Sequence, residues 1–247
     1  MTKRPANNAN RVRRTQEQRR TETQEAILSA ALHVLSEDGF SKFSASRVAA
    51  RAEVSRGALE HYLPTKNDLL VAATQYAMDH AVAHAKGLAE RANKSEDPIR
   101  KFMLDSEHFF FSPGYRAMLE LAMAANGEPE LSRPFQPIVT KARESLNGIW
   151  LDTLQKAGYP HQKAQDFVEL THHLFRGVFL AKTWLPYNTD WRAMMKIWSA
   201  LAPTILGPQK VAPVRQNGRV ADTAGKTAIK SVKRRTIKRA TMGSIPG

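Results

Sequence analysis

The stretch that most constrains this chain runs from residue 45 to residue 64 and reads ASRVAARAEVSRGALEHYLP. It holds two sets of small or branched apolar residues at helical spacing, namely Val48, Ala49 and Ala52, then Ala58, Leu59, Tyr62 and Leu63. Only Glu53-Val54-Ser55 links them. A link this short lets two helices cross steeply if a small residue lies at the crossing and an apolar residue fills the turn, and Ala49 and Val54 meet those needs. Ser55 can then cap the second helix.

Two structures are compatible with this pattern. One is an ordinary helical hairpin packed into a core. The other is a helix-turn-helix, whose second helix lies in a DNA major groove. We favour the second, because the link, the cap and the flanking charge agree.

The charge is concentrated at the two ends of the chain. Residues 1–20 hold seven Lys/Arg and one acid (+6), and residues 208–247 hold ten Lys/Arg and one acid (+9). The residues between them carry −1 of the total of +14. Basic tails attract polyanions, and nucleic acid fits the motif best. Solubility or an unrelated acidic partner is the alternative.

Length and composition exclude several other classes. At 247 residues the chain can bury a sizeable core. It has no cysteine, so it has neither disulfides nor thiolate metal sites, which suits a reducing cytoplasm. No apolar run approaches the roughly 20 residues of a membrane-spanning helix, and the start MTKRPANNANRVRR lacks the apolar segment of a secretory signal. We therefore expect a cytoplasmic protein with no membrane association and no cofactor.

The segments around the motif also have helical patterns. A first helix begins after Thr15 or Thr21, each of which has Gln three residues later at the capping-box spacing, and it ends at Asp38 before a glycine. Its apolar stripe consists of Ile27, Leu28, Ala31, Val34 and Leu35. Thr65 is the expected cap of a long helix that reaches about Ala92.

The rest of the chain up to residue 207 reads as helices, so the fold class is all-α. The expected helices span residues 98–111, 115–125, 135–156, 161–184 and 189–206, with a proline-containing loop over 129–134.

Residues 26–70 resemble the N-terminal DNA-binding domain of TetR-like transcriptional regulators. The matching features are the apolar first helix ending in Asp38-Gly39-Phe40, Ser44, Val48-Ala49, Val54-Ser55-Arg56-Gly57-Ala58-Leu59, and Pro64-Thr65-Lys66 before Leu69-Leu70. The resemblance covers about residues 20–75. It implies a three-helix helix-turn-helix domain joined by a long helix to a larger helical domain that binds ligand and dimerises.

On that basis we expect a homodimeric repressor that binds a double-stranded DNA operator and is released by a small-molecule effector. The expected domains are a disordered basic arm (1–14), a helix-turn-helix domain (15–66), a helical ligand-binding and dimerisation domain (67–207) and a disordered basic tail (208–247). The tail holds six cations between Lys230 and Arg239, and we expect it to clamp phosphates without regard to sequence.

Three positions depart from the family pattern. Glu53 stands where glycine is frequent, so either its backbone is left-handed, at a cost on the order of 1 kcal/mol, or the turn differs. Glu60 replaces a usual tyrosine, and its carboxylate either turns away from phosphates, accepts from a cytosine amino group or lowers affinity. Tyr62 and Leu63 replace a frequent His-Phe pair.

The candidate DNA-binding residues lie in and around the motif, and they are Ser44, Ser55, Arg56, Gly57, Glu60, His61, Tyr62 and Lys66. We expect Ser55 and Arg56 to read bases, with Gly57 allowing a close approach, and the remaining donors to contact phosphates. Lys66 has the alternative of a simple surface lysine. The arginines ahead of the motif, which are Arg11, Arg13, Arg14, Arg19 and Arg20, either enter the minor groove or form a solvated leader.

The last two helices carry more large apolar residues than one subunit commonly covers. We expect them to form the dimer interface through Phe167, Leu170, Leu174, Phe175, Val178, Met194, Trp198 and Leu201, unless both helices are simply core. Candidate ligand-pocket residues, on helices that line the regulatory cavity in the family, are Met103, Phe109, Phe110, Met118, Met123 and Trp150, and core packing is again the alternative.

Other functions have less support. His108, His172 and His173 lack the spacing of a metal site, so we expect no metal. No nucleophile–base pair, carboxylate pair or phosphate loop appears at a telling spacing, so we expect no enzyme. The rival to a sequence-specific regulator is an architectural protein that binds DNA non-specifically through its basic tails.

Overall fold

The computed structural model describes residues 15–95, 97–184 and 190–209. This part of the chain is helical without a strand, which confirms the all-α class. Its elements in order are α1 (Gln16–Asp38), the 3₁₀-helix η1 (Phe40–Lys42), α2 (Ala45–Arg51), α3 (Arg56–Tyr62), α4 (Lys66–Ser95), α5 (Pro98–Phe110), α6 (Pro113–Ala124), α7 (Pro129–Lys156), α8 (His161–Trp184) and α9 (Trp191–Leu206). All of them fall within the unit Met1–Ala212, and the second unit, Pro213–Gly247, lies outside the described residues, as does the predicted arm.

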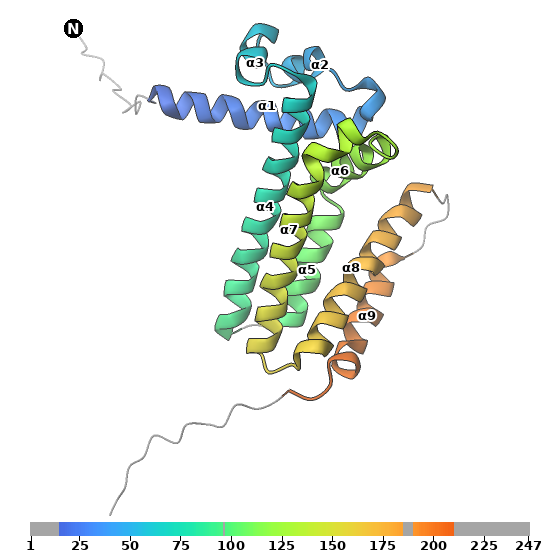
Figure 1. Cartoon of the computed structure of the whole chain (residues 1–247). Helices are drawn as coiled ribbons and strands as arrows, with labels where there is room; N and C mark the ends of the chain where they lie inside the picture. Colours follow the sequence, from blue (N-terminus) through green and yellow to red (C-terminus); the bar gives the residue numbers. More distant parts are fainter. Residues whose placement is uncertain (1–14, 96, 185–189, 210–247) are drawn as a thin grey trace, which may run out of the picture. The chain divides into compact units, whose positions relative to one another are not determined.

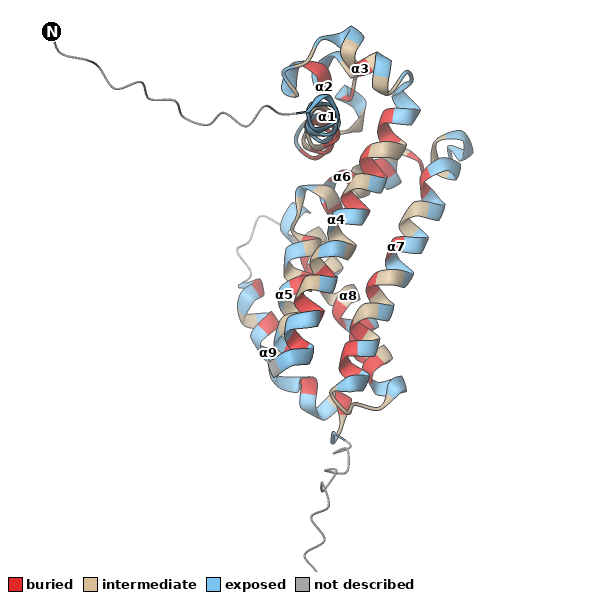
Figure 2. Cartoon of the chain, turned by 90° about the vertical axis from the view of Figure 1, so that its left-hand side faces the viewer, coloured by how far each residue is buried: buried red, intermediate tan, exposed pale blue. Residues whose placement is uncertain are grey.

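The helices form two groups that share α4. Near its start, α4 packs against α1, which lies across it, and α2 and α3 stand beside α1 (Figure 1). Further along, α4 runs beside α7 and α5. The helix α8 contacts α5 and α7, and α9 contacts α8 and α5. Buried residues follow the inner faces of these helices (Figure 2).

The first helix begins at the earlier of its two candidate positions. The hydroxyl of Thr15 accepts the backbone N–H of Gln18 at 3.1 Å, and the amide oxygen of Gln18 accepts the backbone N–H of Thr15 at 2.9 Å. This capping box satisfies two backbone donors that a helix end leaves free. The five residues of the predicted apolar stripe are all buried. The helix ends at Gly39, whose φ of 79° suits glycine.

One hydrophobic core joins the N-terminal helices to α6 and α7. Leu59 of α3 and Leu69 of α4 are buried in it together with Ala117 and Leu121 of α6 and Phe135 of α7. The three N-terminal helices therefore do not have a core of their own. A shift of α6 would disturb the packing that holds α1 and α3 in place.

The predicted loop over residues 129–134 is wrong, because α7 begins at Pro129. A proline in the first turn costs a helix nothing, since that N–H has no partner anyway. Pro134 and Pro137 lie inside the helix, where each removes a backbone hydrogen bond. Both prolines are exposed, so water can reach the freed carbonyls, and the burial of Phe135 between them favours the helical turn. The other helix bounds agree with prediction to within three residues.

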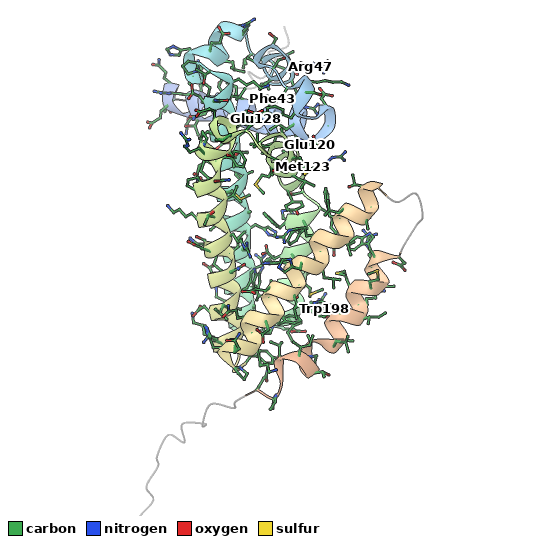
Figure 3. The ribbon with its side chains drawn as sticks, turned by 45° about the vertical axis from the view of Figure 1, so that its right-hand side comes forward. Phe43, Arg47, Glu120, Met123, Glu128 and Trp198 are labelled. Carbon is green, nitrogen blue, oxygen red and sulfur yellow. The ribbon has the colours of Figure 1, made fainter. Side chains whose placement is uncertain are left out.

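Aromatic side chains fill the core between α5, α7, α8 and α9. Phe102 lies 5.4 Å from Trp150 and 5.8 Å from Phe167, measured between ring centroids, and all three are fully buried. Figure 3 shows Trp198 on α9, where its indole N–H donates to the hydroxyl of Thr171 on α8 at 2.8 Å. Among the described helices, none is both long and apolar enough to cross a membrane.

Candidate nucleic-acid interface and an internal cavity

The second helix of the motif, α3, is short, and it is held by a cap at its start and by a buried leucine. The hydroxyl of Ser55 accepts the backbone N–H of Ala58 at 3.1 Å and caps the first turn. Leu59 is 1 % exposed and anchors the helix in the core. Ser55, Arg56, Gly57 and His61 are exposed, so they lie on the face that the core does not use. This arrangement can present the start of α3 to a groove.

The turn before α3 has a left-handed backbone at Glu53, which is one of the two alternatives that the sequence left open. Its φ is 55°, and no other non-glycine in the described ranges has a positive φ. A side chain in this conformation is strained. The turn closes through the backbone N–H of Val54, which donates to the carbonyl of Ala49 at 3.0 Å, and Ala49 is buried as predicted for the crossing point.

The sequence did not lead us to expect an ion pair on the recognition helix itself. Arg56 Nε donates to Glu60 Oε1 at 2.7 Å, across one turn of α3. The i, i+4 spacing was a signal for this pair, but we considered Glu60 only against phosphates and bases. In the structure the carboxylate of Glu60 instead holds the guanidinium of Arg56 and offsets part of its positive charge.

Two arginines attach α2 to α1. Arg47 donates to Asp38 at 2.7 Å, and Arg51 donates both guanidinium nitrogens to Glu37 at 2.7 and 2.9 Å. The hydrogen bonds from Arg51 and from His33 hold the pKa of the Glu37 carboxyl below its usual value. These pairs orient the first helix of the motif, and Arg47 is labelled in Figure 3. They join residues nine and fourteen positions apart, beyond what helical spacing predicts.

The remaining candidate DNA contacts surround α3. Ser44 accepts the backbone N–H of Arg47 at 3.4 Å and so caps α2. Tyr62 is partly buried, with the guanidinium of Arg20 5.9 Å from its ring centroid. The ammonium of Lys66 lies 4.3 Å from the ring centroid of Phe40, a cation–π contact that keeps it at the surface near α3. Arg11, Arg13 and Arg14 lie outside the described residues. DNA contact by these residues stays a prediction.

A cavity of about 110 Å³ lies among α4, α5, α6, α7 and α8. Its lining consists of Met78, Asp105, Phe109, Phe110, Tyr115, Met118, Val139, Arg143, Leu146, Asn147, Glu169, His172, His173 and Arg176. Three of the predicted pocket residues are therefore in the wall. The other three lie elsewhere: Met103 is partly buried between two aromatic clusters, Trp150 is in the core, and Met123 is 65 % exposed on α6 (Figure 3).

Asp105 anchors one side of the cavity. Its carboxylate accepts the indole N–H of Trp150 at 2.7 Å and the Nδ1–H of His84 at 2.8 Å. Burial raises the pKa of Asp105, and these two hydrogen bonds oppose the rise. The ring of His84 stacks on His108 at 4.0 Å, and burial lowers the pKa of His108. Trp150 thus supports a polar network as well as the core.

Six polar side chains on α7 and α8 also line the cavity. These are Arg143, Asn147, Glu169, His172, His173 and Arg176. Burial, with Arg176 and Arg143 nearby, lowers the pKa of His172 to about 4, so its ring is neutral at pH 7. Asn147 Oδ1 is buried without a hydrogen-bond partner. We had considered His172 only as a metal ligand, and no sequence spacing links residues on two separate helices.

The exposed apolar residues of α8 and α9 form a surface of their own. Leu170 is 50 % exposed, and Met194, Ile197 and Leu201 are 39 %, 63 % and 46 % exposed. The last three repeat at spacings of three and four residues, which is one face of α9. Phe167, Phe175 and Val178, which we also assigned to the dimer interface, are buried within the subunit, and Leu174 and Trp198 are partly buried.

The described part of the chain contains no group of three or more acidic or His side chains arranged to hold a metal ion. The short capped helix presented beside α1, together with the helical body behind it, defines the class as helix-turn-helix DNA-binding regulators.

Comparison with known proteins agrees with this class. The family model for bacterial regulatory proteins of the tetR family matches residues 27–73. The HTH-type transcriptional regulator CymR of Pseudomonas putida is 31 % identical over 172 residues, which cover 70 % of this chain and 85 % of that protein. An uncharacterized HTH-type transcriptional regulator of Mycobacterium tuberculosis is 25 % identical over 175 residues, which cover 70 % of this chain and 89 % of that protein. The chain belongs to the TetR family of transcriptional regulators.

Solved structures show the same fold. A transcriptional regulator from Rhodococcus sp. Rha1 has a TM-score of 0.56 at 22 % identity, covering 77 % of this chain and 99 % of that one. The multidrug binding protein EbrR, in complex with imidazole, has a TM-score of 0.52 at 19 % identity, and the match covers 76 % of this chain and 97 % of that one.

Proposed function

We propose that this regulator is a homodimeric repressor that acts in the cytoplasm, binds a double-stranded DNA operator through α3 and leaves it when a small molecule enters the cavity. The proposal involves no catalytic step and no cofactor. The observation that carries it is the position of α6. Tyr115 and Met118 of this helix line the cavity, while Ala117 and Leu121 are buried in the core shared with α1 and α3.

This shared core supports the release step. A ligand that contacts Tyr115 and Met118 binds best to one position of α6, and it therefore favours that position. Because Leu121 packs in the same core as Leu59, the favoured position of α6 changes where α3 stands. Release follows if the two recognition helices of a dimer then no longer match the groove spacing. The EbrR complex shows that a protein of this fold takes a small molecule.

The experiment for DNA recognition is a competition measurement. The operator is first selected from random DNA by the full-length protein, and its affinity is then compared with that of random DNA at fixed salt. A repressor should discriminate by at least about a thousandfold. Arg56→Ala should lower that ratio by about five- to a hundredfold, because it removes a base-reading donor that contributes about 1–3 kcal/mol of discrimination. Arg133→Ala on α7 is the matched control. A ratio near one would favour the architectural alternative instead.

The homodimer rests on the exposed apolar stripe of α8 and α9. Leu170, Met194, Ile197 and Leu201 together leave more apolar surface than a lone subunit usually shows. A two-fold pairing of these helices would cover it and set two copies of α3 on one face of DNA. Ile197→Glu should therefore convert the dimer to a monomer in light scattering. Met123→Glu, which alters an equally exposed residue away from the stripe, should leave the mass unchanged; a wild-type monomer would contradict the proposal.

A further inference from the structure

We propose that the cavity binds a small organic anion with one flat ring, whose carboxylate lies between Arg143 and Arg176. This inference rests on the proposed function, because it names the class of effector that would enter the cavity. The arginines come from α7 and α8, and both line the cavity.

The charge of the cavity wall favours an anion. In the described ranges, no carboxylate lies within ion-pair distance of Arg143 or of Arg176. Arg176 contacts His173 Nδ1 at 3.1 Å and also interacts with the side chain of Tyr115, and both of these partners are uncharged acceptors. Arg143 is exposed, whereas Arg176 is partly buried and lies 5.8 Å from the ring centroid of Phe110. A partly buried charge gains from an anionic partner, because removing a charge from water is costly. Both arginines line the cavity, so a carboxylate placed between them can accept from both.

The two carboxylates of the wall do not fill that place. Asp105 is engaged by His84 and Trp150 at the other side of the cavity. Glu169 stands exposed at the rim and accepts from Gln165 at 3.1 Å. A cationic ligand would need a free acid inside the cavity, and neither of these residues supplies one. The electrostatics therefore favour an anion over a cation.

Neutral hydrogen-bonding groups lie beside the arginines. His172 is uncharged at pH 7, since burial lowers its pKa to about 4, and a neutral imidazole can donate one N–H to a carboxylate. The amide of Asn147, whose Oδ1 is buried and has no partner, can satisfy a polar group of the ligand in either orientation. A buried polar atom normally has a partner, so this one points to a ligand.

The ring is indicated by the apolar side of the cavity. Phe109 and Phe110 lie 5.1 Å apart, and Phe110 and Tyr115 lie 4.9 Å apart, between centroids. Together with Met118 they form an aromatic wall against which a flat ring can pack. A volume of about 110 Å³ has room for on the order of one six-membered ring. A bound ring touches α5 and α6 while its carboxylate links α7 to α8, so the ligand joins all four helices.

The test uses three probes of nearly equal size and shape on the full-length protein. Benzoate carries a negative charge, benzamide is neutral, and benzamidine is positive at pH 7. Calorimetry should show benzoate binding at least about tenfold more tightly than benzamide, because two charge-assisted hydrogen bonds are lost in the amide. Benzamidine should bind more weakly still, and acetate, which lacks the ring, should not bind at millimolar concentration. Equal affinity for the three ring compounds, or no binding of benzoate, would overturn the proposal.

Variants locate the charge effect. Arg176→Met and Arg143→Met should each weaken benzoate by about tenfold or more and leave benzamide unchanged. Arg133→Met, an exposed arginine of α7 that pairs with Glu130 at 3.7 Å, is the control and should change neither. The wild-type probe series needs no variant, so a misfolded variant does not remove the test. An unchanged benzoate-to-benzamide ratio in both cavity variants would contradict the assigned site.

The ligand class and the proposed function fail in different ways. If benzoate binds with the expected preference but the protein stays on operator DNA, then ligand binding in the cavity does not release the repressor, and the anion site is still supported. If the operator is bound specifically but the three ring probes bind equally, the repressor stands and the anion site is wrong.

Discussion

The recognition helix and the cavity differ in how far apart along the chain their partners lie. In α3 the contacts join residues three and four positions apart, as in Ser55 with Ala58 and Arg56 with Glu60. Around the cavity, Asp105 joins His84, 21 positions away, and Trp150, 45 positions away. The surface of α3 can therefore change by single substitutions without moving anything else. Polar groups in the cavity depend on one another, so changes there are coupled.

The largest effect should come from breaking the fully buried contact between α3 and the core. Leu59→Ala removes a fully buried side chain and should lower the free energy of unfolding by about 2–5 kcal/mol, since it leaves a cavity in the core shared with α6. Urea unfolding followed by circular dichroism measures this. Leu104→Ala, at a leucine that is 43 % exposed, should cost under about 1 kcal/mol. Equal losses at both sites would mean that α3 is not anchored by the core.

The cavity should show itself in the pH dependence of stability. The pKa of His172 falls from 6.5 to about 4 in the folded state, so protonation favours the unfolded chain. The stabilisation is complete above pH 6.5, is lost as the pH falls toward 4, and amounts to at most about 3 kcal/mol. His172→Gln should remove this part of the acid sensitivity. Between pH 8 and pH 4 the wild type should lose up to about 3 kcal/mol more unfolding free energy than the variant. Curves that stay parallel over this range would contradict a His172 that is neutral in the folded protein.

The same difference explains what the sequence could predict. Caps and turns depend on neighbours, so Ser55 followed from spacing, and spacing narrowed the first cap to Thr15 or Thr21, of which the structure has Thr15. The left-handed Glu53 was one of two alternatives raised by the family resemblance. The helix through Pro134 did not, because burial of Phe135 against other helices outweighs the local preference of proline. The presence of Arg143 and Arg176 in the wall of one cavity was beyond prediction as well. It depends on how α7 lies against α8, which no spacing along the chain specifies.

A smaller effect is expected in the turn before α3. Glu53→Gly relieves a β-carbon at a φ of 55° and should raise the unfolding free energy by up to about 1 kcal/mol. Glu53→Ala is the matched control, because it removes the charge but keeps the β-carbon. The rise in unfolding free energy should appear in the Glu53→Gly variant and be absent from the Glu53→Ala variant. If alanine stabilises as much as glycine, the charge of Glu53 causes the strain and the backbone does not.

The smallest effect concerns Glu60, whose carboxylate binds Arg56 at 2.7 Å. Both side chains are exposed, so Glu60→Gln should change stability little. It removes a negative charge next to the phosphates and frees Arg56 to contact them, so affinity for random DNA should rise about two- to fivefold. The ratio of affinities for operator and random DNA should fall, because Arg56 is then no longer held in one orientation for base reading.

Fluorescence anisotropy with operator and random DNA separates these two effects. Glu130→Gln, which breaks the corresponding surface pair with Arg133 on α7, is the control and should alter neither affinity. If Glu60→Gln instead weakens operator binding by about tenfold and leaves random DNA unaffected, Glu60 itself accepts from a base, as a carboxylate does from the amino group of cytosine. In that case the ion pair positions a base-reading carboxylate, and the specificity of α3 lies with Glu60.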